Sequence, residues 1–175
     1  MGYDEIPLSL DELRSLSLWS ADSAEQALPL FEAVAPDDLR PRAAIEAVRE
    51  FGAGGKRTKQ IRTTAWGALK AAGEIGDPAA EAAARAAVGA AGSAYLHPLA
   101  AATQVKHVVA AAQYAAYAQE LASGDPAAAD AVIRGAVERV PPVVREVLRR
   151  FPLGSPGRSR LGELHRALET ALRGD

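Results

Sequence analysis

Cysteine is absent from this 175-residue sequence, which excludes disulfide bonds and thiolate metal ligands. Aromatic residues make up only 5% of the chain, so few large side chains are available to fill a core. No stretch approaches the roughly 20 consecutive apolar residues that a membrane-spanning helix needs. The first residues include acids where a secretory signal peptide would be basic. Together these absences predict a cytoplasmic protein that does not enter a membrane.

The sequence also has no large excess of charge of one sign, because 20 basic and 22 acidic side chains leave a formal net charge of −2. This balance gives no general attraction to nucleic acid or to an acidic membrane. The distribution is uneven, with acidic residues in the N-terminal third and arginines in the segment PPVVREVLRRFP (141–152) and beyond it. That segment lacks the interleaved aromatic residues that stack on bases, so nucleic acid is a poor candidate partner. The dipolar pattern suits a protein partner at least as well.

Alanine is abundant, at 40 positions of 175. It has the best helix propensity and little value in a strand, so the composition predicts helices in close contact across small side chains. Ser9 and Glu12 have the spacing of a capping box, which opens a helix. The tripeptide GDP occurs at 76–78 and again at 124–126, where it combines a helix stop, an N-cap and a first-turn proline.

These signals predict an all-α fold of about eight helices, as a single domain over residues 1–175 with residues 1–8 as an irregular N-terminus. Pro29 predicts a kink or break near residues 20–25, and Asp37 or Asp38 is expected to cap the next helix. Trp66 is expected among the larger apolar groups of its helix. The later helices are expected at about 58–75, 78–94, 98–122, 126–139, 142–151 and 159–173.

A basic cluster lies in GAGGKRTKQIR (52–62), which at first resembles a phosphate loop. The Walker pattern requires a glycine where Glu50 stands and a serine or threonine after Gly55-Lys56, so we exclude a P-loop. The remaining feature is a set of four cations in the first turns of a predicted helix, namely Lys56, Arg57, Lys59 and Arg62. Cations there oppose the helix dipole, which favours an anionic partner. The alternative is a solvated face, or ion pairs with acids such as Glu46 and Glu50.

The segment YLHPLAAATQVKH (95–107) holds two of the three histidines. Pro98 is expected at the first helical position, which makes His97 the N-cap or the residue before it. At about 100° per residue, Gln104, His107 and Tyr114 share one stripe and would line a polar pocket. The alternative is that His107 forms a hydrogen bond within the core while His97 only caps the helix. The two histidines lack i, i+4 spacing, so we expect no metal site, and nothing in the sequence calls for a cofactor.

Five segments of the chain resemble a known family. They are LSLDELRSLSLWSADSAEQALPLFE, DDLRPRAAIEAVREF, GGKRTKQIRTTAWGALKAA, AYLHPLAAATQVKHVVAAAQYAA and VLRRFPLGSPGRSRLGELHRAL. In this order they resemble the immunity-five-like family, immunity proteins of bacterial polymorphic toxin systems that sometimes carry an exonuclease label. The resemblance extends over residues 8–173. The exonuclease label finds no support in the residues, because neither a P-loop nor a long coiled coil is present.

The resemblance implies an interaction protein that binds a cognate toxin and blocks its active site or its entry into a membrane. It supplies no catalytic residue, although polar positions such as Arg57 and His97 are part of it. The alternative is a protein that binds a small anion, or an enzyme. In that case Arg57, Lys59 and Arg62 would hold the anion, and His107 or His97 would act as general acid or base.

We favour the binding protein over the enzyme, and the sequence carries no signal for an oligomeric state. A regulatory or scaffold domain is a third, less specific alternative. Convergence of the polar residues on one concave pocket would favour the small-molecule alternative. Their scatter over an exposed face would favour toxin binding.

Overall fold

The computed structural model describes residues 2–174, in which nine α-helices and one short 3-10 helix form and no β-strand does. This confirms the all-α prediction. The helices are α1 (Leu10–Glu25), α2 (Leu28–Val34), α3 (Arg40–Gly52), α4 (Lys59–Glu74), α5 (Pro78–Ser93), α6 (Lys106–Ser123), α7 (Pro126–Arg139), α8 (Pro142–Arg150) and α9 (Arg160–Arg173), with the 3-10 helix at Ala102–Gln104. None of the helices in this range is long and apolar enough to cross a membrane.

Side-chain caps begin several helices where the sequence predicts them. At α1 the Ser9 hydroxyl accepts a hydrogen bond from the Glu12 amide (3.1 Å), and the Glu12 carboxylate accepts one from the Ser9 amide (2.9 Å). The carboxylates of Asp77 and Asp125 cap α5 and α7, each followed by proline in the first turn. The two GDP signals therefore mark helix starts, as expected.

Two predicted helix boundaries near the N-terminus are wrong. The first break lies at residues 26–27, because α1 continues to Glu25 and Pro29 occupies the first turn of α2 instead of interrupting a helix. The N-cap of α3 is Leu39, with no side-chain cap. Asp38 lies one residue too early for that role, and its carboxylate binds the amide and guanidinium of Arg40 instead.

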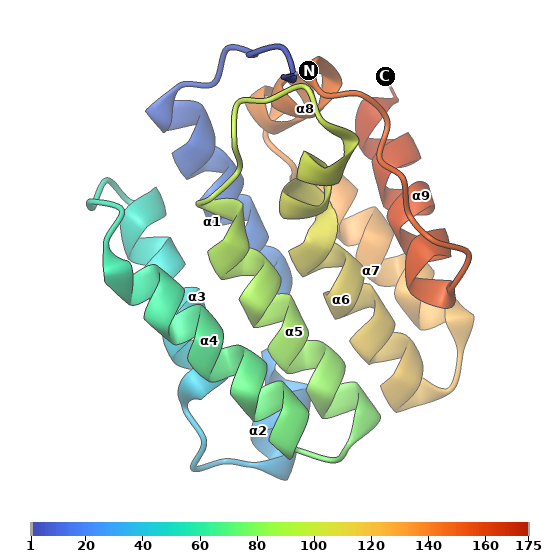
Figure 1. The fold of residues 1–175 in the computed structure, drawn as a ribbon. Helices are drawn as coiled ribbons and strands as arrows, with labels where there is room; N and C mark the ends of the chain where they lie inside the picture. Colours follow the sequence, from blue (N-terminus) through green and yellow to red (C-terminus); the bar gives the residue numbers. More distant parts are fainter. Residues whose placement is uncertain (1, 175) are drawn as a thin grey trace.

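Helix α5 forms the centre of the bundle, in contact with α1, α2, α3, α4 and α6 (Figure 1). Nine of its sixteen residues are buried, all alanine except Ser93. The approach to α6 is close because a Cβ built on Gly89 would lie 2.8 Å from the Ala111 nitrogen. Small residues at this crossing therefore set the distance between the two helices.

Trp66, one of the larger apolar groups of its helix, is not part of the core. Its side chain is 65% exposed on α4. The buried face of that helix is formed by Ile61, Ala68 and the pair Ala71 and Ala72. Trp66 lies two positions before Ala68, so its side chain points about 200° around the helix from the buried Ala68 and toward solvent.

The predicted helix start at Pro98 is also wrong, because α6 begins only at Lys106. Residues 98–100 are extended along the N-terminal segment. Ile6 donates its amide hydrogen to the Pro98 carbonyl (2.9 Å), and Ala100 donates to the Asp4 carbonyl (2.8 Å). This pairing satisfies backbone groups that a helix would otherwise use, so tertiary contact overrides the local signal from proline.

The end of the chain is tied to its beginning by an ion pair. The Glu12 carboxylate receives two hydrogen bonds from the Arg150 guanidinium, at 2.7 and 2.8 Å. These bonds, together with the amide of Ser9, lower the pKa of Glu12 from 4.5 to about 2. The pair therefore fixes α8 against the start of α1.

The close α5–α6 crossing can be tested by adding one methyl group. Gly89→Ala should destabilise the protein by about 1–3 kcal/mol, because the new Cβ meets backbone atoms of α6. Gly73→Ala is the matched control, since a Cβ there meets nothing within 4 Å. It should be neutral or stabilising by about 0.5–1 kcal/mol. Urea unfolding measures both, and equal effects would contradict the tight crossing.

The Glu12–Arg150 pair should give a defined pH dependence. A folded-state pKa below the unfolded value contributes stability above about pH 4.5 that is lost as the pH falls toward about 2. Glu12→Gln should therefore cost about 1–3 kcal/mol near pH 7 and progressively less below about pH 4.5. Chemical unfolding across this range measures the difference. The exposed Glu138→Gln should show no such trend, and a pH-independent cost for Glu12→Gln would refute the assignment.

Candidate functional site

One part of the predicted site is an exposed surface at the start of α4. The cations Arg57 and Arg62 lie over the ring of Tyr95, with guanidinium carbons 5.7 and 5.0 Å from its centroid. Arg57 also donates to the Ala94 carbonyl (3.0 Å). The exposed Trp66 lies one turn beyond Arg62 on the same helix. We call these residues the basic–aromatic surface: Lys56, Arg57, Lys59, Arg62, Trp66 and Tyr95.

The four cations of the basic–aromatic surface form no ion pair with a carboxylate among residues 2–174, so the pairs suggested with Glu46 or Glu50 are not formed. Several arginines elsewhere are engaged within the fold. Arg49, for example, contacts both Asp22 and Glu25, and Arg160 contacts Glu120. Many of the arginines thus serve folding, whereas this cluster leaves its charges facing solvent.

The last third of the chain illustrates the same use of arginine. The guanidinium of Arg145 donates to the Leu172 carbonyl, and that of Arg173 donates to the carbonyls of Phe151 and Pro152. The basic edge expected there is therefore largely an internal set of clamps between α8 and α9.

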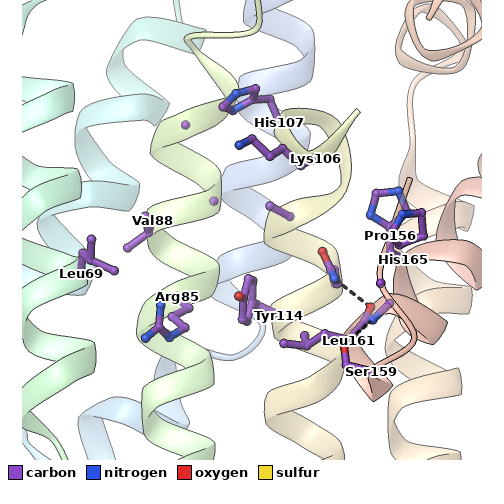
Figure 2. Close-up of a pocket in the computed structure, with 16 residues that line it drawn as sticks. Leu69, Arg85, Val88, Lys106, His107, Tyr114, Pro156, Ser159, Leu161 and His165 are labelled. Atoms are coloured by element: carbon purple, nitrogen blue, oxygen red, sulfur yellow. Dashed lines mark hydrogen bonds between the residues drawn. The ribbon is translucent and has the colours of Figure 1, made fainter. Parts of the chain in front are cut away.

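A second part of the predicted site is a cavity of about 440 Å³ between α5, α6 and the start of α9 (Figure 2). His107 and Tyr114 line it from α6, together with Lys106. Burial lowers the pKa of His107, and the neighbouring charge of Lys106 lowers it further. Apolar side chains such as Leu69 and Val88 form the opposite wall.

His97 and Gln104 lie outside this cavity. The Gln104 side-chain oxygen accepts a hydrogen bond from the His97 amide at 3.0 Å, which closes the turn between α5 and α6. The side chain of His97 is exposed. Gln104 lies in the 3-10 turn before α6, so it does not continue the helical stripe formed by His107 and Tyr114. No group of three or more possible metal ligands lies together within residues 2–174.

The third histidine, His165 on α9, also lines the cavity and was missed by sequence reasoning. Its Nε2 atom lies 3.1 Å from the buried carboxylate of Glu169. That carboxylate also accepts hydrogen bonds from the amide of Gly154 and the guanidinium of Arg173. Burial lowers the pKa of His165, while the charge of Glu169 acts in the opposite direction. The i, i+4 spacing of His165 and Glu169 was the available signal.

The basic–aromatic surface and the cavity are neighbours without being one pocket. Arg62, Trp66 and Tyr95 border a hollow of about 260 Å³. Leu69, Val88 and Gly92 line both this hollow and the cavity, so an apolar strip connects the two. Of the predicted binding residues, Arg62 lies at the hollow and His107 and Tyr114 in the cavity. Arg57 and Lys59 line neither space.

Comparison with known proteins places this arrangement in context. A family model described as "Imm-5 like putative immunity protein" matches residues 7–142. The chain belongs to this immunity-protein family. The match spans α1 to α7 and includes the basic–aromatic surface, but it ends before α9 and His165. No curated protein matches the chain, and no solved structure does. The resemblance inferred from the sequence thus identified the family, while its extension to residue 173 lies beyond the matched residues.

The buried carboxylate on α9 allows a direct test of the His165 environment. Glu169→Gln removes the negative charge that favours protonated His165, so the His165 pKa should fall further. The same change should cost about 1–3 kcal/mol, because it weakens the bonds to Arg173 and Gly154. Histidine-ring NMR titration and urea unfolding measure the two effects.

The control for Glu169→Gln lies on the same helix. Glu163 is exposed and pairs with Arg160, so Glu163→Gln should cost at most about 1 kcal/mol and leave the His165 pKa in place. A His165 pKa that rises, or stays constant, in Glu169→Gln would contradict the proposed contact.

Proposed function

We propose that this protein neutralises a cognate bacterial toxin by binding it through the basic–aromatic surface. Membership of the immunity-protein family supports a toxin as the partner. The observation that carries the proposal is a cluster of four cations without carboxylate partners in the described chain, beside a tryptophan that is 65% exposed. Exposed aromatic and arginine side chains are the residues that most often dominate binding energy at protein interfaces.

The position of the cations supports an external partner. Helix α4 has no acidic residue in its first turn and no side-chain N-cap, whereas it begins with Lys59 and continues with Arg62. Cations at this end of a helix oppose its dipole, at a cost of about 0.3–1 kcal/mol each at low ionic strength. Because no carboxylate of the described chain offsets this cost, a negatively charged partner surface is the natural compensation.

The shape of the surface supports an apolar anchor within the charged rim. The hollow of about 260 Å³ beside Trp66 has mainly apolar walls, including Leu69 and Val88, with Arg62 at its border. A partner side chain of aliphatic or aromatic character could enter this hollow while its acidic neighbours meet the cations. Such an arrangement places a desolvated contact at the centre and charged contacts around it.

The positive charge of the basic–aromatic surface also restricts which kind of toxin surface it can bind. A nuclease cleft is positively charged because it must attract phosphates, and it would repel the basic–aromatic surface. We therefore propose that the toxin presents an acidic face, either around its active site or beside it. Binding there blocks the toxin by occupying that face, with no chemistry required of the immunity protein.

The proposal is tested by co-expressing this protein with a candidate toxin from a gene adjacent to its own, and measuring bacterial growth and complex formation. The wild type should restore growth. Trp66→Ala should weaken the complex about 30-fold or more, because interface tryptophans commonly contribute about 2 kcal/mol or more. The double variant Lys59→Glu/Arg62→Glu should weaken it about tenfold or more, chiefly through a slower association rate. Thermal stability of the double variant should not fall, because acids suit the start of a helix.

The matched control is Arg134→Glu/Arg139→Glu on α7, which makes the same change in net charge at exposed positions. It should leave both growth and affinity unchanged. The proposal is refuted if the wild type fails to restore growth, or if the two double variants weaken the complex equally.

A further inference from the structure

The cavity between α5, α6 and α9 has a composition that toxin binding through the basic–aromatic surface does not explain. Its lining includes Lys106, two histidines and Arg85 but no aspartate or glutamate. Arg85 is already paired with Glu81, at 3.0 Å. Lys106 forms no ion pair with a carboxylate among residues 2–174. The space thus carries positive charge without a negative group facing it.

Lys106 and the two histidines lie at one end of the cavity (Figure 2). Lys106 and His165 line the cavity, and the same two residues also line an adjoining hollow below residues 155–156. They therefore border one common space from opposite elements, α6 and α9. In Figure 2, Lys106 and His107 lie together on α6, with His165 and Pro156 across the opening from them. An anionic group in this space would therefore be bordered by the Lys106 side chain on one side and by His165 on the other.

His165 is held in place by groups that line neither the cavity nor the adjoining hollow. Its Nε2 atom is bound by Glu169, and that carboxylate is in turn held by Arg173 and the Gly154 amide. The remaining ring nitrogen has no hydrogen-bond partner in the described chain, yet it is not among the fully buried unpartnered atoms. With Nε2 held by Glu169, the other ring nitrogen is an acceptor in the neutral ring and becomes a donor toward the cavity only when His165 is protonated.

The rest of the cavity is apolar and suits an organic body attached to the anion. Leu69, Val88 and Leu161 form much of its wall, with the Tyr114 side chain beside them. The volume of about 440 Å³ falls within the range of about 300–1,000 Å³ that is common for small-molecule sites. Gln113 helps to fix this shape, because its amide donates to the Leu161 carbonyl at 2.8 Å and so joins α6 to α9.

We propose that this cavity is a binding site for a small organic anion, a carboxylate or phosphate monoester with an apolar body. Lys106, His107 and His165 hold the charged group, and the body lies against Val88 and Leu161. The site is separate from the basic–aromatic surface, so it does not rest on toxin binding. It also differs from the site predicted from the sequence, because Arg57, Lys59, His97 and Gln104 take no part in it.

Binding of the anion should be coupled to protonation of the two cavity histidines. Both have pKa values lowered from 6.5 by burial, and a bound anion favours their charged forms, so affinity for a carboxylate should rise as the pH falls below about 6.5. Several other charged groups act on them. Lys106 and His97 disfavour protonation of His107, while Arg166 disfavours and Glu169 favours protonation of His165. Arg85 faces the cavity from α5, and Arg173 neutralises part of the Glu169 charge.

The experiment is histidine-ring NMR on the full chain, with phenyl phosphate and phenylacetate as organic anions, inorganic phosphate as the bare anion and 2-phenylethanol as the neutral body. The chain has only three histidines, so the rings of His107 and His165 can be followed separately from that of His97, which lies outside the cavity. At least one organic anion should shift the His107 and His165 signals saturably below about 10 mM and raise their titration midpoints. Inorganic phosphate and 2-phenylethanol should each bind about tenfold more weakly.

Two variants separate this site from a general effect of charge. Lys106→Gln keeps most of an exposed side chain and should weaken organic-anion binding about tenfold. Lys59→Gln, the matched change on the basic–aromatic surface, should not alter it. The proposal is overturned if neither organic anion causes saturable shifts, if the neutral body binds as tightly as the anions, if bare phosphate equals them, or if both variants lose binding equally. Lys106→Gln should still protect against the toxin, so a failure of anion binding can be told apart from a failure of the proposed function.

Discussion

The crossing of α5 and α6 is the contact on which the rest of the molecule depends. Their surfaces carry alanine and glycine, so the backbones approach until Gly89 lies against the amide of Ala111. Each such contact is weak, but many of them add up over two helices of 16 and 18 residues. The remaining helices pack around this pair, α4 on one side and α7 and α9 on the other. Both candidate binding regions are thus positioned by a central helix pair whose buried residues are mostly alanine.

Arginine supplies the long-range connections that small side chains cannot. Arg150 reaches Glu12 and the Pro7 carbonyl, which fixes the last helices to the first one. Arg42 and Glu32 join α3 to α2, and Arg160 joins α9 to α6 through Glu120. Their long side chains reach from one helix to the next over distances that alanine side chains cannot span. This internal use of arginine makes the unpaired cations near the start of α4 stand out as a different kind of feature.

Much of the fold follows from local signals in the sequence, and the exceptions have physical causes. Ser9, Asp77 and Asp125 cap their helices where predicted, because capping depends only on neighbouring residues. Pro98 does not begin a helix, because its carbonyl is bound by the amide of Ile6 from a distant segment. Which face of α4 is buried likewise depends on its neighbours, so the sequence alone did not show that Trp66 is exposed.

The candidate site was predictable to a similar degree. The cations at the start of α4 were found from their density in the sequence, and His107 from its helical spacing to Tyr114. The role of His165 depends on a loop that folds back over α9, with Gly154 bound to Glu169. No short-range sequence pattern predicts such a loop path, although the i, i+4 spacing of His165 and Glu169 within α9 was visible.

Residues 156–165 supply one wall of the cavity, and this wall can change in sequence separately from the basic–aromatic surface. It lies outside the family-matched residues 7–142, whereas the basic–aromatic surface lies within them. Gly162 packs so closely on Gly157 that a Cβ at that position would meet its carbonyl, so the loop path near it is tightly restricted. Exposed loop positions such as Ser155 and Arg158 are freer to change. A substitution at these loop positions would therefore change the opening of the cavity without touching the basic–aromatic surface, because the two lie on separate segments of one scaffold.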